Sequence, residues 1–308
     1  MTIILILLLL LLIVLAITLY AYRIAFYAPK RVEDAPYNLP TGEQYESRHP
    51  NIIKCINEML EIPFEEVYIT AFDGTKLFAR YYHIKDNAPV QIQFHGYRSS
   101  AFLDFCGGSK LARKMKHNCL VVDQRSHGRS EGNAITFGIK ERRDVLSWIN
   151  YILERSGEDT HIILCGLSMG AATVLMSTDL DLPANVKGII ADCPYASPKG
   201  IIQKVCTDMH LPPRLLYPFV KLGAFLFGHF NLEESSAITA VQHTQIPILL
   251  FHGDDDRFVP HEMSKKIKDA CASPATLVLI PEAGHGLCYL VNPEKYEEAT
   301  LAFAKSIL

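Results

Sequence analysis

The chain has 308 residues, of which 49% are hydrophobic and 20% are charged, and its formal net charge is −3. This composition can bury a large hydrophobic core and fits one large domain or two ordinary ones. Because the charge is nearly balanced and no long run of like charges occurs, nothing points to nucleic acid as a partner.

The first feature along the chain is an apolar segment from Ile3 to Leu19, interrupted only by Thr18. With the residues that follow, it reaches about 20 residues, the length that spans a bilayer as a helix. A signal peptide is the alternative, but such peptides have basic residues before a shorter apolar core and end at a small-residue cleavage site. Aromatic residues follow the segment, as they do at membrane interfaces. We therefore expect an uncleaved transmembrane anchor over residues 1–22.

The basic residues that flank this segment lie on its C-terminal side: Arg23, Lys30 and Arg31. The positive-inside rule then predicts a single-pass membrane protein whose C-terminal domain is cytoplasmic. An outward-facing domain is the alternative, since large domains can cross a membrane regardless of flanking charge. The chain has eight cysteines, none in C-x-x-C spacing, and we expect free thiols in a reducing compartment.

Residues 23–64 are predicted to connect the anchor to the domain, because prolines interrupt them and only Ile52–Leu60 has helical spacing. Residues 65–308 begin with a predicted hairpin, Val67–Ile69 and Lys76–His83. Short apolar strands and helices then alternate, which predicts a mostly parallel sheet flanked by helices on both faces. The later strands are expected at Val90–Phe94, Cys119–Val122, Ile162–Cys165, Gly188–Ala191, Ile248–Phe251 and Thr276–Ile280, and the helices near Ser109–Lys116, Ile139–Glu154, Met169–Ser177, His261–Ala270 and Pro293–Ile307.

The long stretch between Ala191 and Ile248 breaks this alternation. It contains several prolines and is very apolar in its middle, where a second membrane segment would be too short and would carry Lys221. A long insertion in a compact domain is usually functional, so we predict a helical lid at about residues 195–245. The candidate pocket residues there are Tyr195, Leu215 and Phe219.

The candidate nucleophile is Ser168, in Gly166-Leu-Ser168-Met-Gly170 between a predicted strand and a predicted helix. This is the G-x-S-x-G pattern in the setting where a sharp turn lifts the serine hydroxyl above the sheet. A Cβ at either glycine would crowd the neighbouring backbone. The serine also lies at a helix N-terminus, where unpaired N–H groups favour developing negative charge.

A serine hydroxyl needs a general base, and His285 is the candidate. It lies in a Gly-His-Gly triplet after the last predicted strand, at the same sheet edge as Ser168. The acid that orients the histidine is expected after Ile248–Phe251. Chemistry alone does not choose among the three adjacent aspartates there, which are Asp254, Asp255 and Asp256.

Together, Gly-Leu-Ser-Met-Gly, His-Gly-Asp-Asp-Asp-Arg-Phe-Val-Pro and Gly-His-Gly resemble the α/β-hydrolase superfamily. Within it, the chain is similar to the bacterial branch of monoacylglycerol lipases, esterases and serine aminopeptidase-like enzymes. The resemblance covers about residues 65–308 and implies the α/β-hydrolase fold. In that branch the acid lies three positions after His-Gly and three before Val, which is Asp256 here; Asp254 would then be a turn residue.

An oxyanion hole needs two hydrogen-bond donors, and one would be the backbone N–H of Met169. By the resemblance, the other belongs to Tyr97, the residue after His95-Gly96, although the lipase-type His-Gly-Gly-Gly is absent.

The segment Asp123–Gly132 resembles the family's Asp-x-Arg-Gly-x-Gly-x-Ser, with Ser126 where glycine is common. We expect Asp123 and Arg125 to fix turns beside the site.

These residues predict a serine hydrolase that cleaves a carboxylic ester through an acyl-enzyme, and the anchor and apolar lid favour a lipid-like ester. A serine peptidase or aminopeptidase of the same superfamily is the alternative, and it would need an acidic pair to hold a substrate amine. An acyltransferase and a non-catalytic membrane-tethered binding protein are further alternatives. No metal-ligand spacing or phosphate-binding glycine loop is evident, so no metal or cofactor is expected. The oligomeric state is left open.

Overall fold

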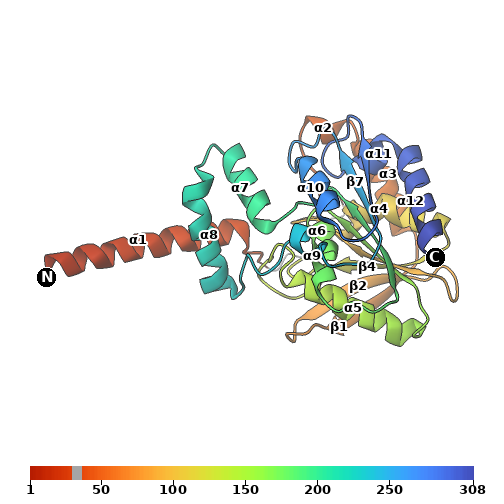
Figure 1. Cartoon of the computed structure of the whole chain (residues 1–308), viewed down its shortest axis with the longest axis horizontal. Helices are drawn as coiled ribbons and strands as arrows, with labels where there is room; N and C mark the ends of the chain where they lie inside the picture. The colour runs from red at the N-terminus through yellow and green to blue at the C-terminus, as the bar shows by residue number, and fades with distance from the viewer. Residues whose placement is uncertain (30–36) are drawn as a thin grey trace.

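The computed structural model describes residues 1–29 and 37–308, which form a helix-flanked sheet with one long helix projecting from it (Figure 1). The strands follow the order β1-β2-β4-β3-β5-β6-β7-β8. The pairs β1·β2 and β2·β4 are antiparallel, and all later pairs are parallel, so the mostly parallel sheet was predicted correctly. The strands are β1 (Glu65–Thr70), β2 (Lys76–Tyr82), β3 (Val90–Phe94), β4 (Asn118–Asp123), β5 (Ile162–Leu167), β6 (Val186–Asp192), β7 (Ile248–Gly253) and β8 (Ala275–Ile280).

Helices cover both faces of the sheet, which is why the central strands β3 and β4 are buried along their whole length. Alternate residues of β4 enter different hydrophobic clusters: Leu120 and Val122 one, Cys119 and Val121 the other. The first cluster includes α5 (Glu141–Ser156), α6 (Met169–Met176) and α10 (Glu262–Ala270), with the short η1 (Ser177–Asp179) following α6. The second includes α3 (His49–Leu60), α4 (Ala101–Lys114), α11 (Cys288–Val291) and α12 (Pro293–Ile307), and the short α2 (Glu43–Glu46) precedes α3.

The helix α4 begins at Ala101, well before the predicted start at Ser109. Two adjacent glycines, Gly107 and Gly108, weaken the sequence signal. Tertiary packing overrides that signal, because a side chain at position 107 would overlap the ring of Tyr289. The N-cap Ser100 accepts a hydrogen bond from the backbone N–H of Leu103 at 3.2 Å, which fixes the early start.

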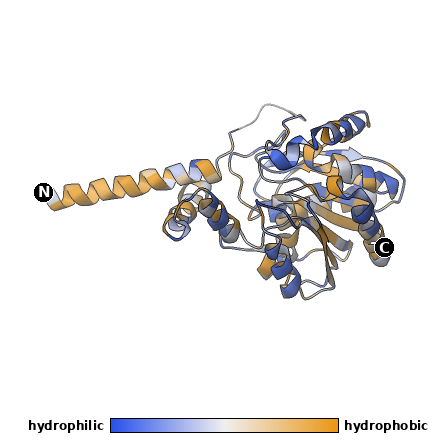
Figure 2. Cartoon of the chain, turned by 90° about the horizontal axis from the view of Figure 1, so that it is seen from above, coloured by the Kyte–Doolittle hydropathy of each residue, from blue (hydrophilic) through white to orange (hydrophobic). Residues whose placement is uncertain are grey.

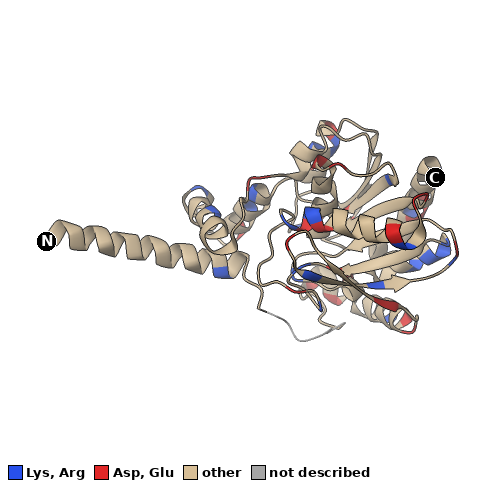
Figure 3. Ribbon diagram, turned by 90° about the horizontal axis from the view of Figure 1, so that it is seen from below, with Lys and Arg blue, Asp and Glu red and all other residues tan. Residues whose placement is uncertain are grey.

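The helix α1 (Thr2–Ala25) extends the predicted anchor by three residues, and most of it projects away from the sheet (Figure 1). Its most apolar window has a mean hydropathy of 3.4, and Figure 2 shows hydrophobic residues along nearly the whole helix. In length and composition α1 therefore fits a membrane span or a signal sequence. Figure 3 shows a basic residue near its end, which is Arg23. Lys30 and Arg31, which also support the predicted orientation, lie outside the described residues.

Three helices lie between β6 and β7, where the lid was predicted: α7 (Pro198–Asp208), α8 (Pro213–Gly228) and the short α9 (Ala237–Ala240). The helix α8 crosses the C-terminal part of α1 (Figure 1). The rings of Tyr22 and Phe227 are 5.7 Å apart, and those of Phe26 and Phe230 are 5.2 Å apart. A Cβ at Gly223 would come within 2.9 Å of the backbone oxygen of Thr18, so the helices can approach this closely only with glycine there. We call residues 18–28 together with α8 the α1–α8 assembly.

Candidate active site

Ser168 lies in the tight turn between β5 and α6. Its φ of 55° and ψ of −113° are unusual for a residue other than glycine, and such strain collects at functional sites. Its backbone N–H donates to the carbonyl of Asp192 at 2.8 Å. A Cβ at Gly170 would overlap the backbone of Phe94 at the end of β3, so α6 can pack this closely only with glycine there. The strand–turn–helix setting that we predicted for Ser168 is present.

His285 follows β8 and joins Ser168 to Asp256. Its Nε2 lies 2.9 Å from Ser168 Oγ, and its Nδ1 lies 2.7 Å from Asp256 Oδ2. The other carboxylate oxygen of Asp256 accepts backbone N–H groups from Phe258 at 2.9 Å and Val259 at 2.8 Å. The turn after β7 therefore fixes the carboxylate, and through it the imidazole. The three residues predicted from different parts of the chain lie in one hydrogen-bonded series.

The two neighbouring aspartates have other partners. Asp254 accepts the backbone N–H of Glu282 at 2.7 Å, which fits the turn role expected of it. Asp255 is partly exposed and pairs with Arg257 at 3.1 Å and with the amide of Gln44 at 2.7 Å. In the described part of the chain, Asp256 is thus the aspartate that meets His285.

Burial raises the pKa of the Asp256 carboxyl, but hydrogen bonds from His252 and His285 outweigh this and hold the pKa well below its usual range. The carboxylate is therefore ionised at neutral pH and accepts a hydrogen bond from His285 Nδ1–H. That leaves the lone pair of Nε2 directed at Ser168 Oγ. His252 also contacts this carboxylate, with its Nε2 3.2 Å from Asp256 Oδ2, and no role was predicted for it from the sequence. Its place at the start of the His-Gly-Asp motif was the available signal.

The loop after β3, residues 95–100, lies against Ser168. The backbone N–H of Gly96 donates to Asp104 Oδ2 at 2.6 Å, and Ser99 Oγ donates to Asp104 Oδ1 at 2.6 Å. A Cβ at Gly96 would lie 3.4 Å from Ser168 Cβ, which shows how closely the loop approaches the serine. Sequence reasoning missed Asp104, although an acid in the first turn of a helix is a recognisable signal for such a contact.

The two predicted oxyanion donors flank this position. Tyr97 lines the same cavity as Ser168. Met169 is the first residue of α6, and the first N–H groups of a helix have no partner within it. Both residues thus lie beside Ser168, where the two oxyanion donors were expected.

A cavity of about 620 Å³ opens beside Ser168 and His285. Its apolar lining includes Leu39 and Ile52 from the connector and Leu103 from α4. The lid residues expected in the pocket are not among its lining residues.

That part of the prediction was wrong, and the packing explains why. Tyr195 is buried in the core near Phe137, with ring centroids 6.4 Å apart. Leu215 is 63% exposed on α8, and Phe219 is partly buried on the same helix. The apolar face of α8 packs against α1 instead of covering the cavity.

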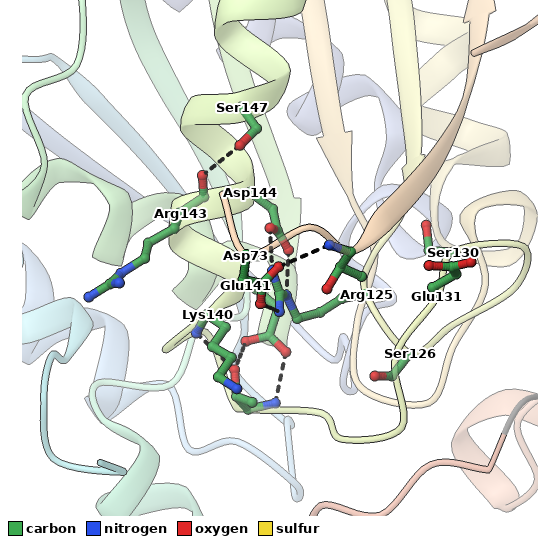
Figure 4. A network of polar contacts seen from close by, with 12 residues as sticks. Asp73, Arg125, Ser126, Ser130, Glu131, Lys140, Glu141, Arg143, Asp144 and Ser147 are labelled. Atoms are coloured by element: carbon green, nitrogen blue, oxygen red, sulfur yellow. Dashed lines mark hydrogen bonds and ion pairs between the residues drawn. The ribbon is translucent and has the colours of Figure 1, made fainter. Parts of the chain in front are cut away.

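The segment Asp123–Gly132 has the supporting geometry that we expected. Arg125 pairs with both oxygens of Asp144 at 2.6 Å and with Asp73 at 2.9 Å, as Figure 4 shows. Asp123 accepts from Arg80 at 2.8 Å. Ser126 has a φ of 65°, which explains why glycine is common at its position. These contacts stabilise turns, and none of them involves Ser168.

A possible metal-ligand group among the described residues is Cys193, Asp256 and His285, whose ligand atoms lie within 4.8 Å of one another. Burial raises the pKa of the Cys193 thiol well above its ordinary value, which favours the neutral thiol over the thiolate that metals bind. The side chains of Asp256 and His285 are also hydrogen-bonded to each other. All eight cysteines are free, as predicted.

Known proteins match most of this chain. The model of the Alpha/beta hydrolase family matches residues 94–299. The uncharacterized protein YqkD of Bacillus subtilis is 25% identical over 187 residues, which are 60% of this chain and 61% of YqkD. The lysophosphatidylserine lipase ABHD12 of Danio rerio is 25% identical over 178 residues, which are 54% of this chain and 43% of the lipase. The chain thus spans less than two thirds of either relative.

A solved structure with the same fold is that of the Pyrococcus furiosus esterase Pf2001. It has a TM-score of 0.67 and 23% sequence identity, and the match covers 81% of this chain and 93% of the esterase. With the hydrogen-bonded series at the sheet edge, this likeness confirms the fold predicted from the sequence.

Proposed function

Because this chain belongs to the alpha/beta hydrolase family, we propose that it is a serine hydrolase that cleaves a carboxylic ester through an acyl-enzyme on Ser168. The observation that carries the proposal is the series Ser168–His285–Asp256, with distances of 2.9 and 2.7 Å. The likeness to an esterase fold supports it. Esterase activity is therefore the function that the geometry supports best.

In the first half of the reaction, His285 Nε2 takes the proton of Ser168 Oγ as the oxygen attacks the ester carbonyl. The carbonyl oxygen becomes an oxyanion, which the backbone N–H groups of Tyr97 and Met169 stabilise. Asp256 stabilises the imidazolium without taking its proton. The imidazolium then protonates the leaving alcohol, and the C–O bond breaks to leave an acyl-Ser168 ester.

In the second half, His285 removes a proton from water, which attacks the acyl carbonyl. The tetrahedral intermediate collapses, the proton returns to Ser168 Oγ, and the carboxylic acid departs. The strained turn keeps Ser168 Oγ in place through both steps, because the backbone N–H at its base is already bonded to Asp192.

The proposed substrate is an ester with an apolar acyl chain that reaches the enzyme from a bilayer. Three observations support it: the apolar α1, the apolar lining of the cavity, and the name of the relative from Danio rerio. We propose that α1 is an uncleaved anchor and that the domain faces the cytoplasm, since Arg23 follows the apolar segment. The cavity lies between the connector and α4, so the acyl chain would enter there.

The peptidase alternative needs ionised acids in the cavity to hold a substrate amine. Asp104 lines the cavity, but both of its oxygens are bonded to the loop after β3. Asp192 also lines it, and Oδ1 has no hydrogen-bond partner among the described residues. Burial raises the pKa of Asp192 and favours its neutral form. The site therefore favours an ester over a peptide with a free amine.

Two assays of the full chain in detergent micelles test this proposal. A fluorophosphonate probe should label the wild type and leave Ser168→Ala unlabelled. Turnover of p-nitrophenyl esters should rise with acyl length from acetyl to octanoyl, and an aminoacyl anilide should not be cleaved. Labelling of Ser168→Ala would overturn the serine mechanism. Preference for acetyl or for the anilide would overturn the substrate class.

A further inference from the structure

The end of α1 meets the loop after β3, which is the loop that carries the proposed oxyanion donor. The hydroxyl of Tyr97 donates to the carbonyl of Ala25 at 2.9 Å. The guanidinium of Arg98 donates to the carbonyls of Ile24 at 3.0 Å and Tyr27 at 3.1 Å. These residues are far apart in sequence, so the contacts join the N-terminal helix directly to the surroundings of Ser168.

These contacts satisfy a need that every helix end has. The last carbonyls of a helix have no partner within it and carry partial negative charge. At the end of α1, the cation of Arg98 and the hydroxyl of Tyr97 supply the missing donors. Arg98 Nε also donates to the hydroxyl of Tyr97 at 2.7 Å, so the two side chains act as one unit.

Arg98 also has an unusual backbone, with a φ of 53°. This left-handed conformation is unfavourable for arginine and persists only where surrounding contacts hold it. The backbone N–H of Arg98 donates to His127 Nε2 at 3.0 Å, and that of Gly96 donates to Asp104 at 2.6 Å. The residues on both sides of Tyr97 are therefore fixed, and the contacts of Tyr97 and Arg98 with α1 complete the support of this peptide.

The end of α1 is itself held rigidly, so it can act as a support. The backbone N–H of Ala28 donates to Asn133 at 2.9 Å, and that of Ile135 donates to Phe26 at 2.8 Å. The buried ring of Phe26 packs edge-on against Phe137 at 5.6 Å, and Phe137 in turn lies 5.1 Å from the ring of Tyr97. Polar and apolar contacts thus lead from α1 to the same loop.

We propose that the C-terminal end of α1 is part of the catalytic apparatus and that Arg98 is a positioning residue. Held by the carbonyls of Ile24 and Tyr27, Arg98 sets the backbone N–H of Tyr97 against the oxyanion. The inference rests on the proposed function, because it assumes an oxyanion at Ser168. It assigns to the N-terminal segment a role in the chemical step, beyond tethering.

The test measures kcat and KM for p-nitrophenyl butyrate with the full chain in detergent micelles. Arg98→Ala should lower kcat about 10- to 100-fold and change KM less than about threefold, because the donor acts on the transition state. Arg98→Lys should recover part of kcat, since an ammonium can reach one carbonyl. The rate of fluorophosphonate labelling should fall in the same proportion as kcat.

Two further variants keep the test decisive. Tyr97→Phe removes only the hydroxyl and should lower kcat about 3- to 10-fold even if Arg98→Ala does not fold. Arg155→Ala is the matched control. Arg155, on α5, also stacks on a tyrosine, Tyr81, at 4.2 Å and binds Glu65 at 2.8 Å. These partners lie on β2 and β1, which β4 and β3 separate from β5, the strand that leads to Ser168. The kcat of Arg155→Ala should equal that of the wild type.

The outcomes separate the two levels of inference. If Arg98→Ala and Tyr97→Phe turn over like the wild type while Ser168→Ala is inactive, the positioning role is wrong and the proposed function stands. A loss of kcat/KM in Arg98→Ala that comes with a lowered thermal midpoint and is not rescued in Arg98→Lys would also overturn the positioning role. If Ser168→Ala remains active, the proposed function fails and this inference fails with it.

Discussion

The surroundings of Ser168 and the α1–α8 assembly are held together by different forces. Polar contacts in short turns fix the first: each oxygen of Asp256 has its own donors, and Asp104 binds the neighbouring loop. Aromatic packing between distant segments builds the second, through Tyr22, Phe26 and Phe227. The comparison teaches that the first region depends on exact hydrogen-bond geometry, whereas the second depends on buried area. Substitutions around Ser168 should therefore mainly lower the rate, whereas substitutions of the buried aromatic side chains in the α1–α8 assembly should mainly lower the stability.

The largest expected effect is the loss of the nucleophile. Ser168→Ala should lower kcat by about 10⁵-fold or more, because no other group supplies the attacking oxygen. The thermal midpoint should stay near that of the wild type, since only one buried hydroxyl is lost. Ester turnover and thermal unfolding in micelles measure both. If Ser168→Ala retained a tenth of the wild-type activity, Ser168 would not be the nucleophile.

The next effect sharpens the choice among the three aspartates. Asp256→Asn should lower kcat by about 10⁴-fold, because an amide no longer favours the required tautomer of His285. Asp255→Asn is the matched control, since Asp255 is partly exposed and pairs with Arg257 instead of His285. It should keep nearly full turnover in the same assay. Equal losses in both variants would contradict the structural distinction between these neighbours.

In the α1–α8 assembly the expected effect is on stability. Phe26 is fully buried between Phe137 and Phe230, and Phe26→Ala should cost about 3–5 kcal/mol. In a chain of this size that lowers the thermal midpoint by roughly 5–15 °C. Phe225, which is 65% exposed on α8, provides the control, and Phe225→Ala should shift the midpoint by less than about 2 °C. Equal shifts in the two variants would show that the assembly is not packed in solution as described.

The smallest expected effect concerns acyl-chain length. Leu103 lines the cavity beside Ser168, so Leu103→Trp should lower kcat/KM for octanoyl relative to butyryl esters by about 10-fold. Leu215→Trp, on α8, should leave this ratio unchanged because Leu215 does not line the cavity. The ratio of the two ester activities measures the effect directly. If Leu215→Trp changed the ratio and Leu103→Trp did not, the acyl chain would bind at the predicted lid instead of in the cavity.

Local patterns were enough to predict the sheet and the positions of Ser168 and His285. A strand, a G-x-S-x-G turn and a helix are adjacent in sequence, so their geometry is set within a few residues. Asp256 could be chosen only through the family resemblance, because three adjacent aspartates are chemically identical. They differ only in which one the turn after β7 directs toward His285.

Contacts between distant segments could not be predicted in the same way. The pattern of α8 indicates an apolar face but not what covers it, and the structure covers it with α1. This is why Leu215 and Phe219 were placed in the pocket. The role of Asp104 depends on where α4 begins, and the two glycines in that helix hid its start.

The junction of α1 with α8 has a further consequence for how such an enzyme would meet its substrate. Residues 2–17 are largely exposed and are about 24 Å long as a helix, somewhat less than the roughly 30 Å of bilayer hydrocarbon. Embedding them would draw α8, with its exposed Leu215 and Phe225, down to the level of the lipid headgroups. The catalytic domain would then be held at a fixed distance from the membrane and in a fixed orientation relative to it. Encounters would depend on the surface density of the ester and its lateral diffusion, and not on its concentration in water.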